Sequence, residues 1–406
     1  MCRMTYVFYT FAEMRKITAD WVCPVISEPI HNGVVICDDA GKILAIEQRD
    51  HHDVATLEVH HGVLTPGFIN THCHLELSHM KGKVDTGTGL IPFITGVVTQ
   101  RDATQDVIQA AIRQAEQEML EGGIVALGDI SNTPDTFAIK AHGRMRYYTF
   151  LEVFDFLQDE NAQKTVEAGI AVYNRLDLAR DSARALVPHA PYSVSESLFK
   201  AIHAFNPSGS TTVSIHNQET PPENQLFKEK KGAFLDFYGK FGISLDKFQA
   251  SGQTSIYYAL AHLNPYNRNL FVHNTLTTRE EIQAANDWSQ KVYWATCPNA
   301  NLYIENRLPD YSAFMDTNAR MTIGTDSLTS NWQLSILEEM KTIARMQSYV
   351  PFSNILRWAT LNGAEALGFD DSLGSLQPGK RPGILLLNGF DDGWRLGMDA
   401  TVKRLV

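Results

Sequence analysis

Cysteines are few in this chain of 406 residues, and they follow no recognisable pattern. An odd number at irregular spacing, with no Cys-X-X-Cys pair, argues against a disulfide framework. We therefore expect reduced thiols and a cytoplasmic protein. The five cysteines are Cys2, Cys23, Cys37, Cys73 and Cys297.

Long hydrophobic runs are also lacking. The first ten residues are partly apolar, but they are too short for the apolar core of a signal peptide and show no clear cleavage site. No later stretch approaches the length of a membrane span, so we expect no membrane partner. Strand-like patterning begins only at Met14, and residues 1–13 are expected to be an extension or an over-assigned start.

Positive charge is in short supply. The chain has 35 Lys and Arg against 46 Asp and Glu, which gives a formal net charge of −11. The densest basic cluster, residues 228–231, is interrupted by Glu229 and is typical of a solvated helix face. We expect no nucleic-acid partner. A small-molecule substrate with nucleobase-like groups remains compatible with this negative charge, because recognition of a small molecule needs no net positive charge.

A hydrophobic content of 44% with 20% charged residues is ordinary for a globular protein with a large core. Short β-rich runs separated by turn signals occupy the N-terminal region, and strand-like runs return at residues 384–387 and 400–406. We expect the two chain ends, residues 1–64 and 373–406, to form a small β-sandwich domain. The expected N-terminal strands are residues 17–22, 33–37, 43–46 and 54–59.

Between these ends, in residues 65–372, strand-like apolar runs alternate with amphipathic helical stretches, which is the pattern of a parallel α/β protein. Eight candidate strands suit a (β/α)8 TIM barrel, whose active site lies where the strands end. The candidate strands end near His74, Asp129, Glu152, His189, His216, His273, Cys297 and Asp326.

Helix signals support the intervals between the strands. Residues 106–122 have apolar positions near helical spacing and stop at a Gly-Gly pair, while Ser193 with Glu196 and Thr277 with Glu280 have capping-box spacing. The interval at residues 219–270 is longer than a single connecting helix requires. We expect an insertion there, over the mouth of the barrel.

Three short strings carry ligands for a hydrolytic metal. His72 and His74 alternate at a strand end, so both side chains point to one face, roughly 6–7 Å apart along the backbone. His216 ends a second strand, and Asp326 ends the last one. Three imidazoles and a carboxylate suit a borderline divalent ion such as zinc, with a position left open for water.

Each of these residues also has a simpler interpretation. His72 and His74 could be polar barrel filling, but up to four ring nitrogens would then need partners. His216 alone would more often be a buried core histidine, and Asp326 could cap the next helix. Glu219, three residues after His216, could be a solvated loop residue. The combination of all of them favours the metal site.

Two further histidines stand at strand ends. His273 ends Asn269-Leu-Phe-Val-His273, and His189 lies in Val187-Pro-His-Ala-Pro-Tyr192. One could hydrogen-bond the attacking hydroxide and the other the substrate, or each could be structural.

As a set, these motifs resemble the amidohydrolase superfamily, in particular its mononuclear aminohydrolase branch, which includes nucleoside and nucleobase deaminases and triazine hydrolases. The motifs are Pro66-Gly-Phe-Ile-Asn-Thr-His-Cys-His74, His216-Asn-Gln-Glu219, Val272-His273, Cys297-Pro-Asn-Ala-Asn301, Gly324-Thr-Asp326 and Gly374-Ser-Leu-Gln-Pro-Gly-Lys380.

The resemblance implies His72, His74, His216 and Asp326 as metal ligands. It further implies Glu219 as a proton shuttle, His273 as the residue that steers the hydroxide, and His189 as a substrate contact. As the only acid at the end of the last strand, Asp326 can be both the fourth ligand and the base. Binuclear relatives place a carboxylated lysine at the fourth strand end, whereas this chain has Pro188-His189-Ala190 there. A single ion is therefore expected, zinc or else iron.

The reaction implied is hydrolytic removal of an exocyclic amine from an aromatic heterocycle, such as an adenine-type nucleoside; the aminodeoxyfutalosine deaminase group is the most similar. We expect Ser330, Asn331, Trp332, residues 77–81 and the insertion to line the substrate pocket. A guanine, cytosine or S-adenosylhomocysteine deaminase, a triazine-type chlorohydrolase, an amide-ring hydrolase, and a silent binding protein of this fold are the alternatives. A homodimer is compatible with the sequence.

Overall fold

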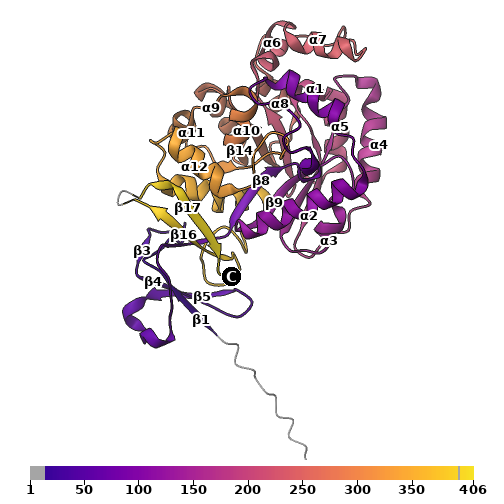
Figure 1. Ribbon diagram of the computed structural model, residues 1–406. Coiled ribbons are helices and arrows are strands. Elements are labelled where there is room, and N and C mark those ends of the chain that lie inside the picture. Colours follow the sequence, from indigo (N-terminus) through magenta and orange to yellow (C-terminus); the bar gives the residue numbers. More distant parts are fainter. Residues whose placement is uncertain (1–13, 392–393) are drawn as a thin grey trace, which may run out of the picture.

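The computed structural model describes residues 14–391 and 394–406 (Figure 1). The expected N-terminal extension, with Cys2, lies outside the described residues. Within the described part of the chain, no helix has the length and apolar character that a membrane crossing requires.

Both chain ends contribute to the β-structure at one end of the molecule (Figure 1). One sheet has the order β5-β4-β1-β6, and the other has the order β17-β16-β7-β2-β3, in which C-terminal β16 pairs antiparallel with N-terminal β7. Ile17, Val35, Leu64 and Leu386 lie in one buried cluster that includes strands of both sheets. The bounds are β1 (Arg15–Thr18), β2 (Trp21–Val22), β3 (Ile30–His31), β4 (Gly33–Cys37), β5 (Ile43–Gln48), β6 (Glu58–Val59), β7 (Val63–Pro66), β16 (Ile384–Phe390) and β17 (Leu396–Arg404).

The prediction of a strand at residues 54–59 is wrong for the first half of that segment. Val54–Thr56 form a 3-10 turn, and only Glu58–Val59 are extended. The Asp53 side chain accepts a hydrogen bond from the backbone N–H of Ala55 and thereby starts the turn. Val54 is exposed, so no buried face holds this segment in a strand.

The middle of the described chain contains two four-stranded parallel sheets, with orders β8-β9-β10-β11 and β12-β13-β14-β15. Their strands end close to the predicted positions, and most of their residues are buried, as expected for parallel strands covered on both faces. The bounds are β8 (Phe68–Cys73), β9 (Ile124–Ser131), β10 (Arg146–Val153), β11 (Ala183–Pro188), β12 (Thr212–Asn217), β13 (Arg268–His273), β14 (Val292–Thr296) and β15 (Met321–Ile323).

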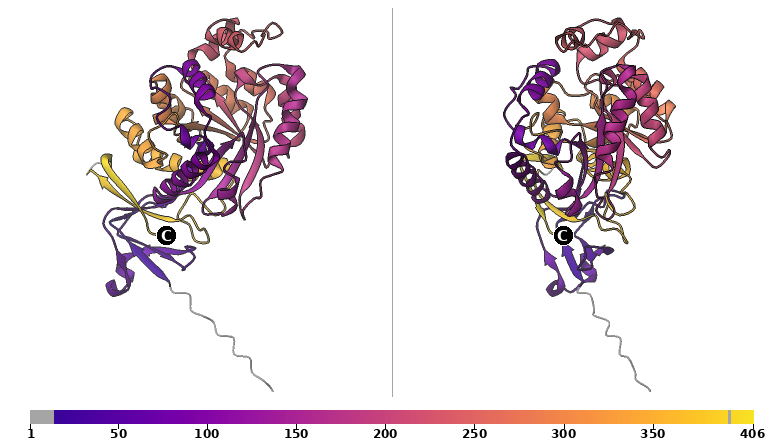
Figure 2. Two further views of the ribbon diagram at one scale, coloured as in Figure 1. Left: turned by 45° about the vertical axis from the view of Figure 1, so that its right-hand side comes forward. Right: turned by 90° about the vertical axis from the view of Figure 1, so that its right-hand side faces the viewer.

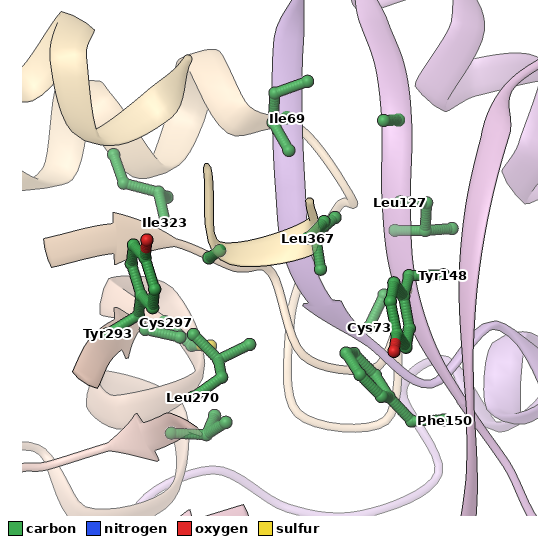
Figure 3. Close-up of a cluster of buried hydrophobic side chains, with 14 of the residues drawn as sticks. Ile69, Cys73, Leu127, Tyr148, Phe150, Leu270, Tyr293, Cys297, Ile323 and Leu367 are labelled. Atoms are coloured by element: carbon green, nitrogen blue, oxygen red, sulfur yellow. The ribbon is translucent and has the colours of Figure 1, made fainter. Parts of the chain in front are cut away.

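The two sheets meet at both edges. Cys73 and Asp326 form a parallel bridge that joins the end of β8 to the residues after β15. At the other edge, the backbone N–H of His216 donates to the carbonyl oxygen of His189 at 2.9 Å, which joins β12 to the end of β11. Apolar side chains from both sheets, including Ile69, Leu127, Leu270 and Ile323, belong to one core cluster (Figure 3).

Helices cover the strands (Figures 1 and 2). The expected helix at residues 106–122 is present as α2. The described helices outside the insertion are α1 (Leu90–Gln100), α2 (Gln105–Glu121), α3 (Phe137–Ala141), α4 (Ala162–Tyr173), α5 (Glu196–Phe205), α9 (Arg279–Trp288), α10 (Pro298–Glu305), α11 (Tyr311–Asp316), α12 (Ile336–Met346), α13 (Phe352–Ala359) and α14 (Leu361–Leu367).

Both predicted capping boxes are misplaced. Helix α5 is capped by Ser195, whose hydroxyl accepts from the Leu198 N–H. The capping box of α9 is formed one residue later than expected, by Thr278 and Glu281. The hydroxyl of Thr277 is used elsewhere, because it donates to Gln218 Oε1 at 2.6 Å.

The predicted insertion between β12 and β13 contains α6 (Pro221–Glu229), α7 (Ala233–Lys240) and α8 (Ser255–His262). Helices α6 and α7 lie at the end of the molecule away from β1 and β5 (Figures 1 and 2). Their apolar residues, among them Phe227 and Phe234, share a buried cluster with Met80, which follows β8, and with Tyr192, which follows β11. The insertion therefore packs against the loops that follow the strands.

A buried ion pair supports the end of β8. Lys140 Nζ of α3 lies 2.6 Å from Asp129 Oδ2 of β9, and both side chains are almost fully buried. Lys140 also donates to Ser131 Oγ at 2.8 Å. The other carboxylate oxygen of Asp129 accepts the backbone N–H of Leu75, the residue after His74. The pair thus fixes the backbone at the pair of strand-end histidines.

Replacing Lys140 by Met should lower the free energy of unfolding by about 3–5 kcal/mol, because it leaves the buried Asp129 carboxylate without its counter-charge. The measurement is urea denaturation followed by circular dichroism. Lys200→Met is the control, since Lys200 pairs with Glu196 at the exposed surface and should change stability little. Equal, small effects of both substitutions would contradict this account.

Candidate active site

The four predicted metal ligands lie together at the strand ends. His72 and His74 come from β8 with ring centroids 5.0 Å apart, and the ring of His216 from β12 lies 4.9 Å from that of His72. Asp326 Oδ1 lies 3.6 Å from His72 Nε2 and 3.4 Å from His74 Nε2. All four side chains are buried or nearly so.

The loop after β15 holds Asp326 against β8. The backbone N–H groups of Thr325 and Asp326 both donate to the carbonyl oxygen of His72 at 3.0 Å. Gly324 permits this approach, because a Cβ there would lie 2.8 Å from His72 Cβ. Asp326 does not cap the next helix, since α12 begins at Ile336 with Ser335 as its cap.

The orientation of the Asp326 carboxylate is fixed by Ser330. The Ser330 hydroxyl donates to Oδ2 at 2.6 Å, while Oδ1 faces His72 and His74. Asp326 adopts a positive φ of 55°, which is uncommon outside glycine. This backbone conformation is held by the two hydrogen bonds to His72.

The cluster fits a single divalent metal ion. The ligand atoms of His72, His74 and His216 lie within 4.8 Å of one another, as do those of His72, His273 and Asp326. Neither ring nitrogen of His72 has a hydrogen-bond partner, although the side chain is fully buried. A bound ion would satisfy one of these nitrogens, which otherwise carry the cost of unpaired buried groups. His216 Nδ1 donates to the His189 carbonyl at 2.8 Å, which leaves Nε2 free as a ligand.

Burial sets the protonation states around this centre. It lowers the pKa of His72 and takes the pKa of His216 well below its usual value, so both imidazoles are neutral and able to bind a metal at neutral pH. Burial alone would raise the pKa of Asp326. The neighbouring imidazoles of His72, His74 and His273 outweigh it and hold that pKa well below its usual value.

Glu219 lies beside the centre and is buried. Its Oε1 lies 3.7 Å from His273 Nε2. Burial raises its pKa well above the usual value, and the negative charges of Asp326 and Glu223 add to the effect. The raised pKa favours the protonated carboxyl group, which can donate a proton. The backbone N–H groups of Gln218 and Glu219 donate to the carboxylate of Glu223 at 3.0 and 3.1 Å, which positions the loop.

His273 is buried at the end of β13. Its Nδ1–H donates to Asn301 Oδ1 of α10 at 2.8 Å, so Nε2 is left on the side of Glu219. Burial lowers the pKa of His273 to about 4. The ring is neutral at neutral pH, and Nε2 can accept a hydrogen bond.

His189 lies at the edge of the cluster, with a side chain that is 24% exposed. Its Nδ1 lies 2.8 Å from Glu152 Oε1, and its ring centroid lies 4.6 Å from that of His216. Burial alone would raise the pKa of Glu152, but the His189, His216 and His74 imidazoles hold it below its usual value.

The three predicted pocket residues after Asp326 have different surroundings. Ser330 is bonded to Asp326. Asn331 is buried, and its amide donates to the Thr325 carbonyl and to Glu339 Oε1, both at 2.7 Å, while its Oδ1 accepts the Trp332 N–H. Trp332 is 49% exposed, with its ring 5.3 Å from that of Tyr303. Of these three, Trp332 has the most accessible side chain.

Sequence reasoning assigned no role to Glu152, Glu223 or Asn301. Glu152 stands at a predicted strand end, so a rule that treats every polar residue there as a candidate would have found it. Asn301 lies in a motif that the sequence analysis singled out. Glu223 carries no local signal, because its role depends on the turn that brings it back to Gln218 and Glu219.

Comparison with known proteins gives a consistent result. The model of the family described as the Amidohydrolase family matches residues 63–402. An adenosine deaminase of Helicobacter pylori is 26% identical over 338 residues, which are 81% of this chain and 80% of that protein. A crystal structure of H. pylori aminofutalosine deaminase in complex with methylthio-coformycin has a TM-score of 0.77 at 24% identity and covers 93% of each chain. A crystal structure of an adenosine deaminase from Xanthomonas campestris with bound zinc has a TM-score of 0.68 at 22% identity, covering 92% of this chain and 84% of that one.

Protein prepared without added metal should contain close to one equivalent of zinc and iron in total, measured by elemental analysis. His216→Ala should lose both metal and activity, because three ligands replace four. His203→Ala, in α5 and outside the cluster, is the control and should keep the metal. Two tightly held equivalents, or full activity without metal, would contradict the single-ion site.

Proposed function

The chain belongs to the amidohydrolase family, and from this premise we propose that it is a metal-dependent hydrolase that removes the exocyclic amine from an adenine-type nucleoside. The observation that carries the proposal is the buried Glu219, whose pKa is raised, beside a cluster of histidines and an aspartate whose pKa is lowered. Such a site offers both a proton donor and a base, which hydrolysis of a cyclic amidine requires. The similarity to proteins named adenosine deaminase and aminofutalosine deaminase supports the choice of substrate class.

The architecture we infer is one closed (β/α)8 barrel over residues 65–372, with a small β-sandwich domain formed by the described parts of residues 1–64 and 373–406. The contacts at both edges of the two parallel sheets support closure. The buried cluster that includes strands of both antiparallel sheets supports the second domain.

His72, His74, His216 and Asp326 would hold the metal ion, and zinc suits this donor set. When bound, the ion would supply Lewis acidity that makes a water molecule a nucleophile near neutral pH. The zinc in the X. campestris adenosine deaminase structure supports this choice of metal.

The residues around the ion divide the proton transfers between them. Water adds to the ring carbon that bears the amine, while Glu219 gives its proton to the adjacent ring nitrogen. Asp326 accepts the first proton that the water loses and passes it to the departing amine. As ammonia leaves, the new hydroxyl group returns its remaining proton to Glu219, and a lactam remains. His273 orients the water by accepting a hydrogen bond at Nε2, because Asn301 holds its Nδ1–H.

The exposed aromatic side chains near the site suit a nucleoside as the substrate. Phe154 is 37% exposed with its ring 5.7 Å from that of His189, and Trp332 is half exposed on the loop after Asp326. Aromatic faces of this kind bind a flat heterocycle and its apolar substituents.

Glu219→Gln should lower kcat by about 100-fold or more, because the amide cannot donate the proton, while the metal content stays near one equivalent. Glu116→Gln is the matched control. Glu116 is also a buried carboxylate, but it accepts a hydrogen bond from Tyr147, away from the metal ligands. Turnover of Glu219→Gln near the wild-type level would place the proton shuttle elsewhere.

The substrate class can be tested by comparing kcat/KM for release of ammonia. We expect adenine nucleosides, including those with an aryl-bearing ribose substituent, to exceed free guanine and cytosine by about tenfold or more, which is about 1.4 kcal/mol of transition-state discrimination. The opposite preference would overturn the assignment of a nucleoside substrate, but the assignment of deaminase activity would remain valid. Release of chloride from chlorotriazines, without ammonia from any amine, would overturn the deaminase as well.

A further inference from the structure

Glu152 is a buried carboxylate to which the proposed mechanism gives no task. Its Oε1 lies 2.8 Å from His189 Nδ1, and its Oε2 lies 3.7 Å from His216 Nδ1. Asn132 Nδ2 reaches Oε1 only at 3.5 Å, and Oε2 has no hydrogen-bond partner. The imidazole of His189 is thus the nearest polar group that this carboxylate has.

The short separation from Glu152 bears on which nitrogen of His189 carries the proton. A carboxylate oxygen and an unprotonated ring nitrogen are both acceptors, so the 2.8 Å separation favours a proton on Nδ1, although the two groups are not aligned as a hydrogen bond in this structure. His189 then has only Nε2 left for another partner. That atom lies 3.4 Å from the hydroxyl of Tyr192, on a side chain that is partly exposed.

The backbone of His189 is already fixed to the metal ligands. Its carbonyl oxygen accepts both the N–H and the Nδ1–H of His216, at 2.9 and 2.8 Å, and its own N–H donates to Val153 O at 3.2 Å. The remaining freedom is rotation of the side chain. Glu152 at Nδ1 and Tyr192 at Nε2 are the polar groups that restrict it.

We propose that Glu152 is a positioning residue for substrate recognition, which fixes the His189 ring so that Nε2 makes a hydrogen bond to the heterocycle. The inference rests on the proposed function, because it assigns His189 to the substrate of the same site. Phe154 adds an exposed aromatic surface beside this ring. With the proton on Nδ1, Nε2 is an acceptor, so its matching partner is a donor on the heterocycle such as the exocyclic amine.

A second metal site is the main alternative, since ligand atoms of Glu152, His189 and His216 lie within 4.8 Å of one another. The hydrogen bonds argue against it. The Nδ1–H of His216 already donates a hydrogen bond to the His189 carbonyl. The three residues Glu152, His189 and His216 therefore lack a free third atom that could bind a metal. The carboxylate therefore acts on the ring of His189.

The test compares Glu152→Gln, His189→Ala and the double variant, with Glu116→Gln as the buried-carboxylate control. Glu152→Gln should raise KM for the best adenine nucleoside about tenfold with kcat within about threefold, because a contact present before and during the reaction affects binding uniformly. On the His189→Ala background the same substitution should change KM by less than about twofold, as expected for residues that act as one unit. Metal content and Tm should match wild type.

Nitrogen-15 NMR of zinc-loaded protein gives a second measurement that needs no turnover. The His189 signals, assigned by their loss in His189→Ala, should show a protonated Nδ1 in wild type and a changed hydrogen bond in Glu152→Gln. Spectra unchanged by Glu152→Gln would overturn the proposal.

Three further outcomes, two kinetic and one of metal content, would also overturn it. These are unchanged KM, a fall in kcat alone, and the loss of a metal equivalent, which would make Glu152 a ligand. If wild type deaminates no adenine nucleoside, the proposed function fails instead. The kinetic comparison then moves to the heterocycle that wild type does convert, while the NMR result still decides whether Glu152 orients His189.

Discussion

The site depends on the backbone pairing between the first and last parallel strands. The His72 carbonyl accepts two N–H groups from the loop after β15, and this brings Asp326 to the two histidines of β8. Gly324 leaves room for the contact. At the opposite edge, the His189 carbonyl accepts hydrogen bonds from the backbone N–H and the Nδ1–H of His216. These bonds position His216, the third histidine of the cluster. Two carbonyl groups thus fix ligands that are far apart in the sequence.

Burial then determines the chemistry that these side chains can perform. It keeps the imidazoles of His72, His216 and His273 neutral and raises the pKa of Glu219. Asp326 has the opposite outcome, because imidazoles surround its carboxylate and favour the ionised form. The pKa values of two carboxyl groups in one site are therefore shifted in opposite directions, as acid–base catalysis requires.

Much of the architecture could be predicted because it follows from periodicity and end signals. The strand ends were predicted from apolar runs that stop at polar residues, and the parallel strands end close to those positions. Errors arose where tertiary contacts compete with local signals. Thr277 has the spacing of a helix cap but donates to Gln218, so the cap moves to Thr278. Residues 54–56 have strand-like composition, but Asp53 forms a turn and no core covers Val54.

The sequence by itself determined which residues are the candidate ligands, since His-X-His, His-X-X-Glu and Thr-Asp stand at strand ends, and it has Pro188-His189-Ala190 in place of a lysine at the fourth strand end. Tertiary structure alone decided which polar groups support that set. Glu152, Glu223 and Asn301 contact it only because the chain returns to the same strand ends. The physical reason is that a strand fixes the direction of its own side chains, whereas hydrogen bonds and burial between distant segments depend on how the sheets close.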